Sequence, residues 1–294
     1  MKKPTTYEQQ LDNLRSRGLI INDKEFCLKT LRATNYYRLT AYLLPFRKAD
    51  HTYFDGVTFE RIWKIYEFDR ELRVLLFSII EEIELYLRAQ ISYYHAHTYG
   101  ATGYLCPENY DGKHNHEKFM EIVSDSIYAH RNTPIVKHHN KEYGGIFPIW
   151  VIVEFLSTGA MSKFYADLQE KDRKNLSREM FGVHQDVLES WVRCLTDLRN
   201  ICAHYSRLYY AIFTSHPAFP RKMGRVSDKR LFDQVVMLKL MYTNKSQWNA
   251  RLIRKLECII NDYSAYIKLN HIGFPDNWKD VLENRIKIVS GTTE

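Results

Sequence analysis

The sequence has no long hydrophobic run, no C-x-x-C pair and no glycine-rich loop of the kind that cradles phosphate. Its longest apolar run, residues 74–80, is interrupted by Ser78 and is far too short to span a bilayer. No apolar segment follows the charged N-terminal residues, so neither secretion nor membrane insertion is expected. Five cysteines without paired spacing argue against a disulfide framework and a zinc ribbon, and a reducing cytoplasm is the expected location.

Common catalytic and metal-binding patterns are also missing. There is no G-x-S-x-G nucleophile elbow and no arrangement of paired carboxylates. Potential metal ligands gather in the middle of the chain without a strong ligand spacing: Cys106, His114, His116, His138 and His139. We therefore expect a polar loop there rather than a zinc site, and neither a metal nor another cofactor for the protein.

What is present is a composition typical of a folded protein. Apolar residues make up 45% of the 294 residues and charged residues 26%, and there is no internal repeat or low-complexity segment. After Thr58, apolar residues recur every three or four positions from Ile62 to Tyr94, which predicts a helix of nearly forty residues, unbroken or interrupted once. No segment alternates with period two for long, so the predicted fold class is all-α.

Two segments are less clear. Residues 35–46 are rich in aromatic side chains and fit either a helix or a short strand. Residues 100–143 contain glycines, prolines and histidines, and they predict loops with one helix at 117–128. From residue 187 onward helical stripes return, and the first of them contains these residues: Leu188, Trp191, Leu195, Leu198, Cys202 and Tyr205.

The positive charge is concentrated in one stretch. Residues 193–230 contain eight basic and two acidic residues and carry +6 of the net +7. Within this stretch Arg199, Asn200 and His204 form an R-N-x-x-x-H motif. A guanidinium can neutralise a phosphodiester and an imidazole can transfer protons near neutral pH, so together they are suited to cleaving RNA without a metal.

Spacing alone does not single out this pair. With four to six intervening residues, the same pattern is met by Arg88/His95, Arg131/His138 and Arg178/His184. Positions seven apart share a helix face, whereas positions five apart diverge by about 140°. An active Arg199/His204 pair therefore requires a helix end, a kink or a second copy of the chain, and the ordinary alternative is a surface arginine with an unrelated histidine.

The surroundings of the motif distinguish it. Residues 197–209, DLRNICAHYSRLY, resemble the L-R-N-x-x-A-H-H-x-R-L-W signature of abortive-infection proteins of the AbiD/AbiF type, in the HEPN superfamily. Further blocks of the resemblance occur in order along nearly the whole chain: 17–21, 35–42, 68–73, 80–88 and 148–154. One departure is Tyr205, which stands where the signature has a second histidine.

The resemblance implies a metal-independent endoribonuclease used in phage defence and restrained by a small RNA or a protein antitoxin. It also implies a HEPN-like helical bundle at residues 57–294 preceded by a helical extension at 1–56. In such an enzyme His204 would transfer protons, Arg199 would bind the phosphate and Asn200 would orient the site.

Basic and aromatic residues around the motif suit single-stranded RNA, which is held by stacking and by phosphate contacts. The RNA-binding residues that we predict are Arg193, Tyr205, Arg207, Tyr209, Arg221, Lys222 and Arg225. For the tyrosines the alternative is a place in the core. The alternative for the whole protein is a non-catalytic module that holds a structured RNA or a partner protein.

A homodimer is expected, because two copies would bring two Arg199/His204 pairs into one cleft and supply a second acid–base group. The competing arrangement is a monomer in which Arg88 and His95 provide the second site.

Overall fold

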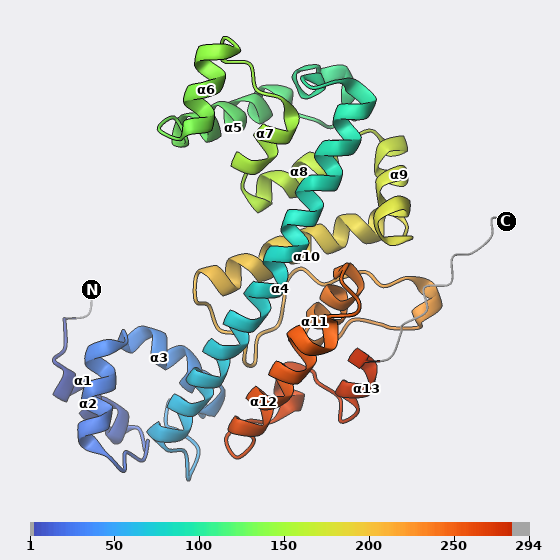
Figure 1. Ribbon diagram of the computed structural model, residues 1–294. Helices are drawn as coiled ribbons and strands as arrows, with labels where there is room; N and C mark the ends of the chain where they lie inside the picture. The colour runs from blue at the N-terminus through green and yellow to red at the C-terminus, as the bar shows by residue number, and fades with distance from the viewer. Residues whose placement is uncertain (1–2, 284–294) are drawn as a thin grey trace.

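The framework of the molecule is α4 (Phe59–Tyr99), a single helix that runs from one end to the other (Figure 1). The structure is a computed structural model and describes residues 3–283. At 1.5 Å per residue, the 41 residues of α4 span about 60 Å. Thr58 caps its start by accepting a hydrogen bond from the N–H of Arg61, and Gly100 ends it at a φ of 83°.

Twelve further α-helices within residues 3–283 pack along and around α4. They are α1 (Tyr7–Ser16), α2 (Lys24–Ala33), α3 (Tyr36–Leu43), α5 (His116–Ala129), α6 (Pro134–Glu142), α7 (Ile149–Phe155), α8 (Thr158–Asp167), α9 (Glu170–Phe181), α10 (Gln185–Ala203), α11 (Leu231–Met241), α12 (Arg254–Tyr263) and α13 (Trp278–Glu283). Only isolated bridges, and no β-strands, occur in this part of the chain. The all-α prediction is confirmed.

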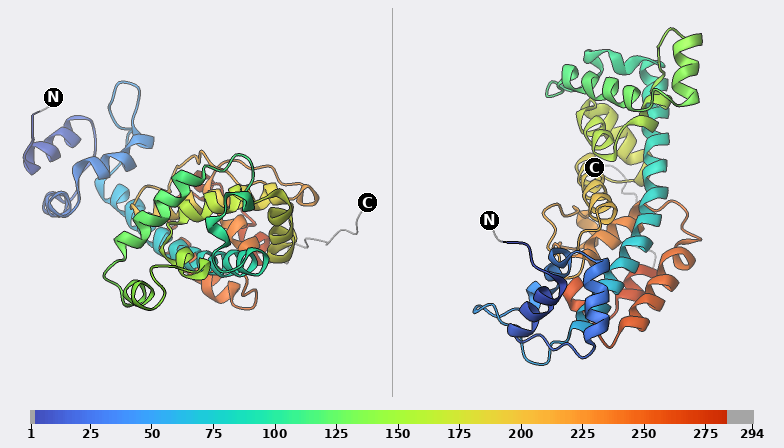
Figure 2. Two further views of the ribbon diagram at one scale, coloured as in Figure 1. Left: turned by 90° about the horizontal axis from the view of Figure 1, so that it is seen from above. Right: turned by 90° about the vertical axis from the view of Figure 1, so that its left-hand side faces the viewer.

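The long helix follows the predicted stripe. Every apolar position of the stripe from Ile62 to Ile91 is at most 5% exposed, and α4 continues without a break. The helices α3, α10 and α7 all contact α4: α3 lies at its N-terminal part, α10 crosses its middle and α7 packs near its C-terminal end (Figure 1). The two groups α1–α3 and α5–α8 therefore lie at opposite ends of the molecule (Figure 2).

The N-terminal segment 1–56, as far as it is described, is helical and shares its core with the rest of the chain. Leu11 and Leu14 are 1% exposed and belong to the same buried cluster as α4. The backbone of Ile20 is joined to the start of α4, since its N–H donates to the carbonyl of Val57 and its carbonyl accepts from the N–H of Phe59. Residues 35–46, whose sequence fits either a helix or a short strand, contain α3. The boundary at residue 56 stays a prediction.

The middle segment is more helical than predicted. The helix expected at 117–128 is present as α5, but α6 was missed, because it is short, begins at a proline and has two consecutive histidines. Proline is well accommodated at the first position of a helix, where its missing N–H costs nothing. Within residues 3–283, none of the helices combines the length and apolarity that crossing a bilayer requires.

Candidate active site at the end of α10

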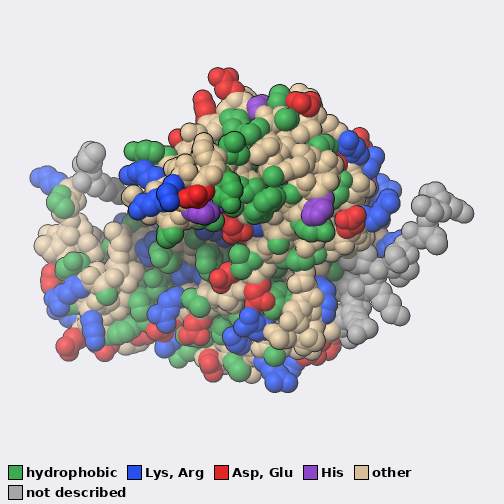
Figure 3. Space-filling model, turned by 45° about the horizontal axis from the view of Figure 1, so that its top comes forward, with side chains coloured by type: hydrophobic (Ala, Val, Ile, Leu, Met, Phe, Trp, Pro, Cys, Tyr) green, Lys and Arg blue, Asp and Glu red, His purple; other side chains and the backbone are tan. Residues whose placement is uncertain are grey.

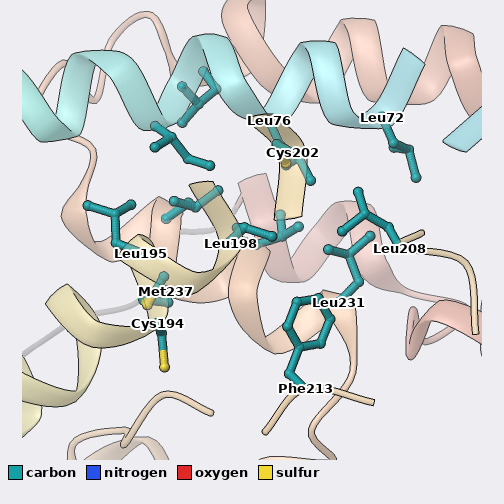
Figure 4. Close-up of a cluster of buried hydrophobic side chains, with 14 of the residues drawn as sticks. Leu72, Leu76, Cys194, Leu195, Leu198, Cys202, Leu208, Phe213, Leu231 and Met237 are labelled. Atoms are coloured by element: carbon teal, nitrogen blue, oxygen red, sulfur yellow. The ribbon is translucent and has the colours of Figure 1, made fainter. Parts of the chain in front are cut away.

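The three predicted catalytic residues lie at the C-terminal end of α10. The inner face of this helix packs on α4 and α11 through Leu195, Leu198 and Cys202, which are all at most 5% exposed (Figure 4). Figure 4 shows Cys202 directly below Leu76 of α4. Close packing against two helices fixes the last turn of α10 and the residues that it carries.

The end of α10 is a Schellman motif, in which the N–H groups after a helix turn back to its last carbonyls. The N–H of Tyr205 donates to the carbonyl of Cys202 at 3.2 Å, and that of Ser206 to the carbonyl of Ile201 at 2.9 Å. Tyr205 has a φ of 58°, in the left-handed region where glycine is usual. His204 is thus the C-cap of α10. The helix end that is one of the conditions for an Arg199/His204 site is therefore present.

At this end a cation and an imidazole stand close to solvent. Arg199 is half-buried, its guanidinium carbon lies 5.8 Å from the ring centroid of Phe77 in α4, and its Nη1 is 3.5 Å from Oδ1 of Asn200. His204 is exposed, and its ring makes no hydrogen bond within residues 3–283. The arrangement can therefore bind an anion at Arg199 and exchange a proton at His204.

The loop after His204 is held by a fully buried carboxylate on α4, Asp69. Its oxygens accept hydrogen bonds from the N–H groups of Leu208, at 3.0 Å, and Tyr209, at 2.8 Å. They also accept from the hydroxyl of Tyr42 at 2.6 Å and from Nη1 of Arg73 at 2.5 Å. Four donors around one buried carboxylate satisfy it and fix the position of the loop.

Two arginines complete this clamp. Nη1 of Arg38, on α3, donates to the carbonyl of Tyr205 at 2.6 Å, and its guanidinium lies 5.9 Å from the Tyr205 ring centroid. Nη1 of Arg73 reaches the carbonyl of Ser206 at 3.3 Å. The N-terminal segment therefore contributes directly to the site, through Arg38 and Tyr42.

The clamp residues come from blocks that carry the sequence resemblance but had been given no role. Asp69 and Arg73 are four residues apart beside the apolar stripe of α4, a spacing that places both on one face. A charged pair at helical spacing inside a buried stripe could have indicated a buried ion pair. The sequence does not show which loop this pair holds, because the N–H groups that donate to Asp69 belong to residues 139 and 140 positions later in the chain.

The sequence profile of the Abi-like protein family matches residues 29–210. The chain belongs to the Abi-like protein family. Neither the curated proteins nor the solved structures give a match. In this Abi-like protein the matched part includes the clamp residues, the end of α10 and the loop up to Tyr210, and family membership points to a role in abortive infection.

Two of the predicted RNA-binding residues of the Abi-like protein, Tyr209 and Arg225, make contacts within the chain. Tyr209 is 2% exposed, and its hydroxyl bonds to Nδ1 of His271 at 2.7 Å, so its ring is not accessible for stacking on a base. Arg225 forms an ion pair with the buried Asp233, with 2.6 Å between Nη2 and Oδ1. For Tyr209 the core alternative is correct, whereas Tyr205 is 65% exposed and does not extend the buried stripe of α10.

The remaining predicted RNA-binding residues are divided between two places. Arg207 is half-buried on the loop that follows His204. Arg193, Arg221 and Lys222 are exposed, but the chain turns back along α10 before residue 221. There the carbonyl of Ala218 accepts a hydrogen bond from the indole N–H of Trp191. Trp191 is thirteen residues before His204, which places it about 20 Å from His204 along α10.

The basic stretch of the sequence is consequently not one continuous basic surface at the site. On the face shown in Figure 3, basic and acidic side chains are interspersed, and hydrophobic side chains reach the surface between them. Near the end of α10, Arg199 and Arg207 contribute positive charge, and Arg38 is engaged in the clamp.

The competing pair Arg88/His95 is buried in the core. Arg88 is 7% exposed and donates to the carbonyl of Val153 and to the carboxylate of Glu84. His95 is fully buried, and neither of its ring nitrogens has a hydrogen-bond partner. Neither side chain is accessible to an RNA phosphate, so this pair does not provide a second active site in the structure.

The burial of His95 predicts acid sensitivity. Burial lowers the pKa of His95 to about 4, against an ordinary value of 6.5, so the unfolded chain binds the proton more readily. Stability is therefore complete above pH 6.5 and is lost as the pH falls towards 4, by up to about 3 kcal/mol from this residue. Urea unfolding at pH 7.0 and at pH 4.5 measures how much the free energy of unfolding falls between the two. We expect this fall to be smaller in His95→Leu and unchanged in the exposed control His216→Ala. An equal pH dependence in wild type and His95→Leu would contradict this account.

Proposed function

We propose that this Abi-like protein is a metal-independent endoribonuclease of the HEPN type that acts in phage defence or in a toxin–antitoxin pair. The observation that carries the proposal is that Arg199 and the exposed His204 both lie at the C-terminal end of α10, next to a loop that a buried network holds in place. A scaffold of four donors around Asp69 gives this part of the surface the rigidity that positioned acid–base chemistry requires.

The chemistry follows from the two side chains. The imidazole of His204 accepts the proton of the RNA 2′-hydroxyl, and the 2′-oxygen attacks the adjacent phosphorus. The bond from phosphorus to the 5′-oxygen breaks, which leaves a 2′,3′-cyclic phosphate and a free 5′-hydroxyl after that oxygen has taken up a proton. Arg199 neutralises the charge on the phosphate oxygens, and Asn200, next to its guanidinium, orients it.

Metal independence can be tested directly. Among residues 3–283 no three histidine, cysteine or carboxylate side chains are placed to hold a metal ion together. We therefore expect cleavage of labelled RNA to proceed in excess EDTA and to leave 2′,3′-cyclic phosphate ends. These ends should resist 3′-end ligation after phosphatase treatment alone, and become ligatable only when acid has opened the ring before the phosphatase is added. Loss of cleavage in EDTA with rescue by Mg²⁺ or Mn²⁺ would refute this mechanism. Binding without cleavage under every condition would support the non-catalytic module instead.

The departing 5′-oxygen needs a proton, and one His204 cannot be both base and acid in the same step. We propose that a second copy supplies the acid through its own His204 in a symmetric dimer. Light scattering at micromolar concentration should give twice the monomer mass of 35.1 kDa, and specific activity should fall on dilution. Mixing wild-type with His204→Ala protein should lower activity by more than the share of the variant, because a mixed dimer keeps only one of the two His204 side chains that the shared site needs. A monomer with undiminished specific activity would exclude the shared site.

We further propose that this activity belongs to the cytoplasm and is kept in check by a small RNA or a protein antitoxin. A free nuclease with an exposed His204 would otherwise attack the RNA of its own cell. Expression with and without the neighbouring genes tests this restraint, because unrestrained wild type should be toxic and His204→Ala should not.

A further inference from the structure

A group of positive side chains beside the candidate active site is left without negative partners. Arg61 lies in the first turn of α4, Arg207 lies on the loop after His204, and Lys268 lies just before the 3-10 helix at Leu269–Ile272. None of these three side chains forms a hydrogen bond or an ion pair within residues 3–283. By contrast, Arg73 and Arg225 are paired with carboxylates.

The contacts place these cations around Tyr210 and His271. The Tyr210 ring stacks on His271 with 4.0 Å between centroids, and its hydroxyl bonds to Nε2 at 2.8 Å. Phe46 meets the edge of Tyr210 at 6.2 Å, and the guanidinium of Arg61 lies 5.6 Å from the Phe46 centroid. From the other side, Arg230 donates to the carbonyl of His271 at 3.1 Å.

Lys268 and Arg207 join the same group. The N–H of Lys268 bonds to the hydroxyl of Tyr209 at 2.9 Å, so that its chain segment lies against this pair of tyrosines. Arg207 is three residues before Tyr210, and its charge acts on the Tyr210 phenol together with those of Arg61 and Arg230. Burial and the charges of Lys268, Arg230 and Arg61 lower the pKa of His271 to about 4, so that this ring is neutral at pH 7.

The carboxylates nearby are already used. Asp69 acts on Arg207 over a distance, but its oxygens are occupied by the four donors of the clamp. Asp228, beside Arg230, accepts from the backbone N–H of that residue. Meanwhile Nη1 of Arg207 and Nε of Arg61 are buried without any partner. A buried guanidinium donor without an acceptor is costly, and an anion in this position would remove the cost.

We propose that Arg61, Arg207, Arg230 and Lys268 form a phosphate-binding site around Tyr210, separate from the Arg199/His204 pair. Guanidinium groups match the oxygens of a phosphate, and several cations suit its double charge, since the nearby Asp69 and Asp228 already accept hydrogen bonds from other donors. Two sources would present this group, a phosphate of an RNA backbone and a free phosphate compound. If the source is RNA, which rests on the proposed function, the site holds the backbone on the loop that carries His204.

The first experiment measures the melting temperature of the whole protein with sodium phosphate and with sodium chloride at the same ionic strength. We expect phosphate, but not chloride, to raise it in wild type and in His204→Ala, since His204 is not part of this site. Arg61→Met and Arg207→Met should lose this rise and weaken phosphate binding at least about tenfold, as measured by ³¹P NMR titration. An equal rise in wild type and both variants, or none in wild type, would overturn the proposal.

A folding control distinguishes the lost ligand from lost structure. Because their guanidinium groups are unpaired, Arg61→Met and Arg207→Met should not lower the melting temperature without phosphate. Arg225→Met breaks the ion pair with Asp233, so it should lower the melting temperature and still show the response to phosphate. If Arg207→Met lowered the melting temperature without phosphate as much as Arg225→Met does, the Arg207 guanidinium would not be unpaired and the proposed site would be contradicted.

The source of the phosphate is decided by RNA binding. The binding constant K of single-stranded RNA is measured at several salt concentrations for the His204→Ala protein and for the same protein carrying Arg207→Met as well. The slope of log K against the logarithm of the salt concentration should be shallower by about one in the double variant. An unchanged slope, with the phosphate response still present in His204→Ala, would assign the site to a free phosphate compound. Absence of RNA cleavage by wild type would refute the proposed nuclease without removing the phosphate response.

Discussion

We expect His204→Ala and Arg199→Ala each to lower the rate of RNA cleavage by roughly 10²- to 10⁴-fold, the usual contribution of positioned acid–base or electrostatic groups. His204 is exposed and holds no other side chain, so its removal should shift the melting temperature by less than about 2 °C. Single-turnover cleavage of labelled RNA, with the melting temperature of each variant, measures both effects.

The matched control is another pair with similar spacing. Arg131 and His138 are both exposed and seven residues apart, far from α10 in the chain. Arg131→Ala with His138→Ala should leave cleavage within about twofold of wild type, a change too small to reflect a catalytic role. If this pair were needed and Arg199/His204 were not, the site would have to be moved to α6. Arg88 and His95 are unsuitable as controls, because both are buried and their loss would disturb the core.

Much of the fold was predictable because it depends on local periodicity. The stripe from Ile62 to Ile91 determines one buried face of α4 without reference to any other segment. The same reasoning placed Leu195, Leu198 and Cys202 on the inner face of α10. It failed for Tyr205, where the periodic pattern continues but the helix has ended and the residue has turned outward with a positive φ.

The candidate site was harder to predict because its parts are joined by long-range contacts. Position in the sequence grouped Tyr209 and Arg225 with His204 as RNA-binding residues, yet one is bonded to His271 and the other to Asp233. Net charge of a segment does not distinguish an arginine with a carboxylate partner from one without. Conversely, Arg38 and Asp69 hold the loop although they are distant in sequence, and Arg61 lies beside Tyr210 only in the folded chain.

The buried carboxylate on α4 leads to the largest expected loss of stability. We expect Asp69→Ala to lower the free energy of unfolding by about 3–5 kcal/mol, because it leaves the buried Arg73 guanidinium without its carboxylate and two buried loop N–H groups without an acceptor. Urea unfolding at pH 7 measures this change. The matched control is Asp55→Ala, since Asp55 pairs with Lys48 on the surface and its loss should cost less than about 1 kcal/mol.

A double variant separates the cost of the unpaired charge from the loss of the loop. Asp69→Leu with Arg73→Met removes both charges, so it should be more stable than the sum of the two single losses predicts. The N–H groups of Leu208 and Tyr209 would still lack their acceptor, so the loop after His204 would remain loosened. Cleavage should therefore stay low in the double variant even where stability recovers. A double variant with wild-type cleavage would show that the clamp on α4 serves folding alone. If Asp69→Ala lowered the free energy of unfolding no more than Asp55→Ala, the stabilising role of the clamp would be refuted.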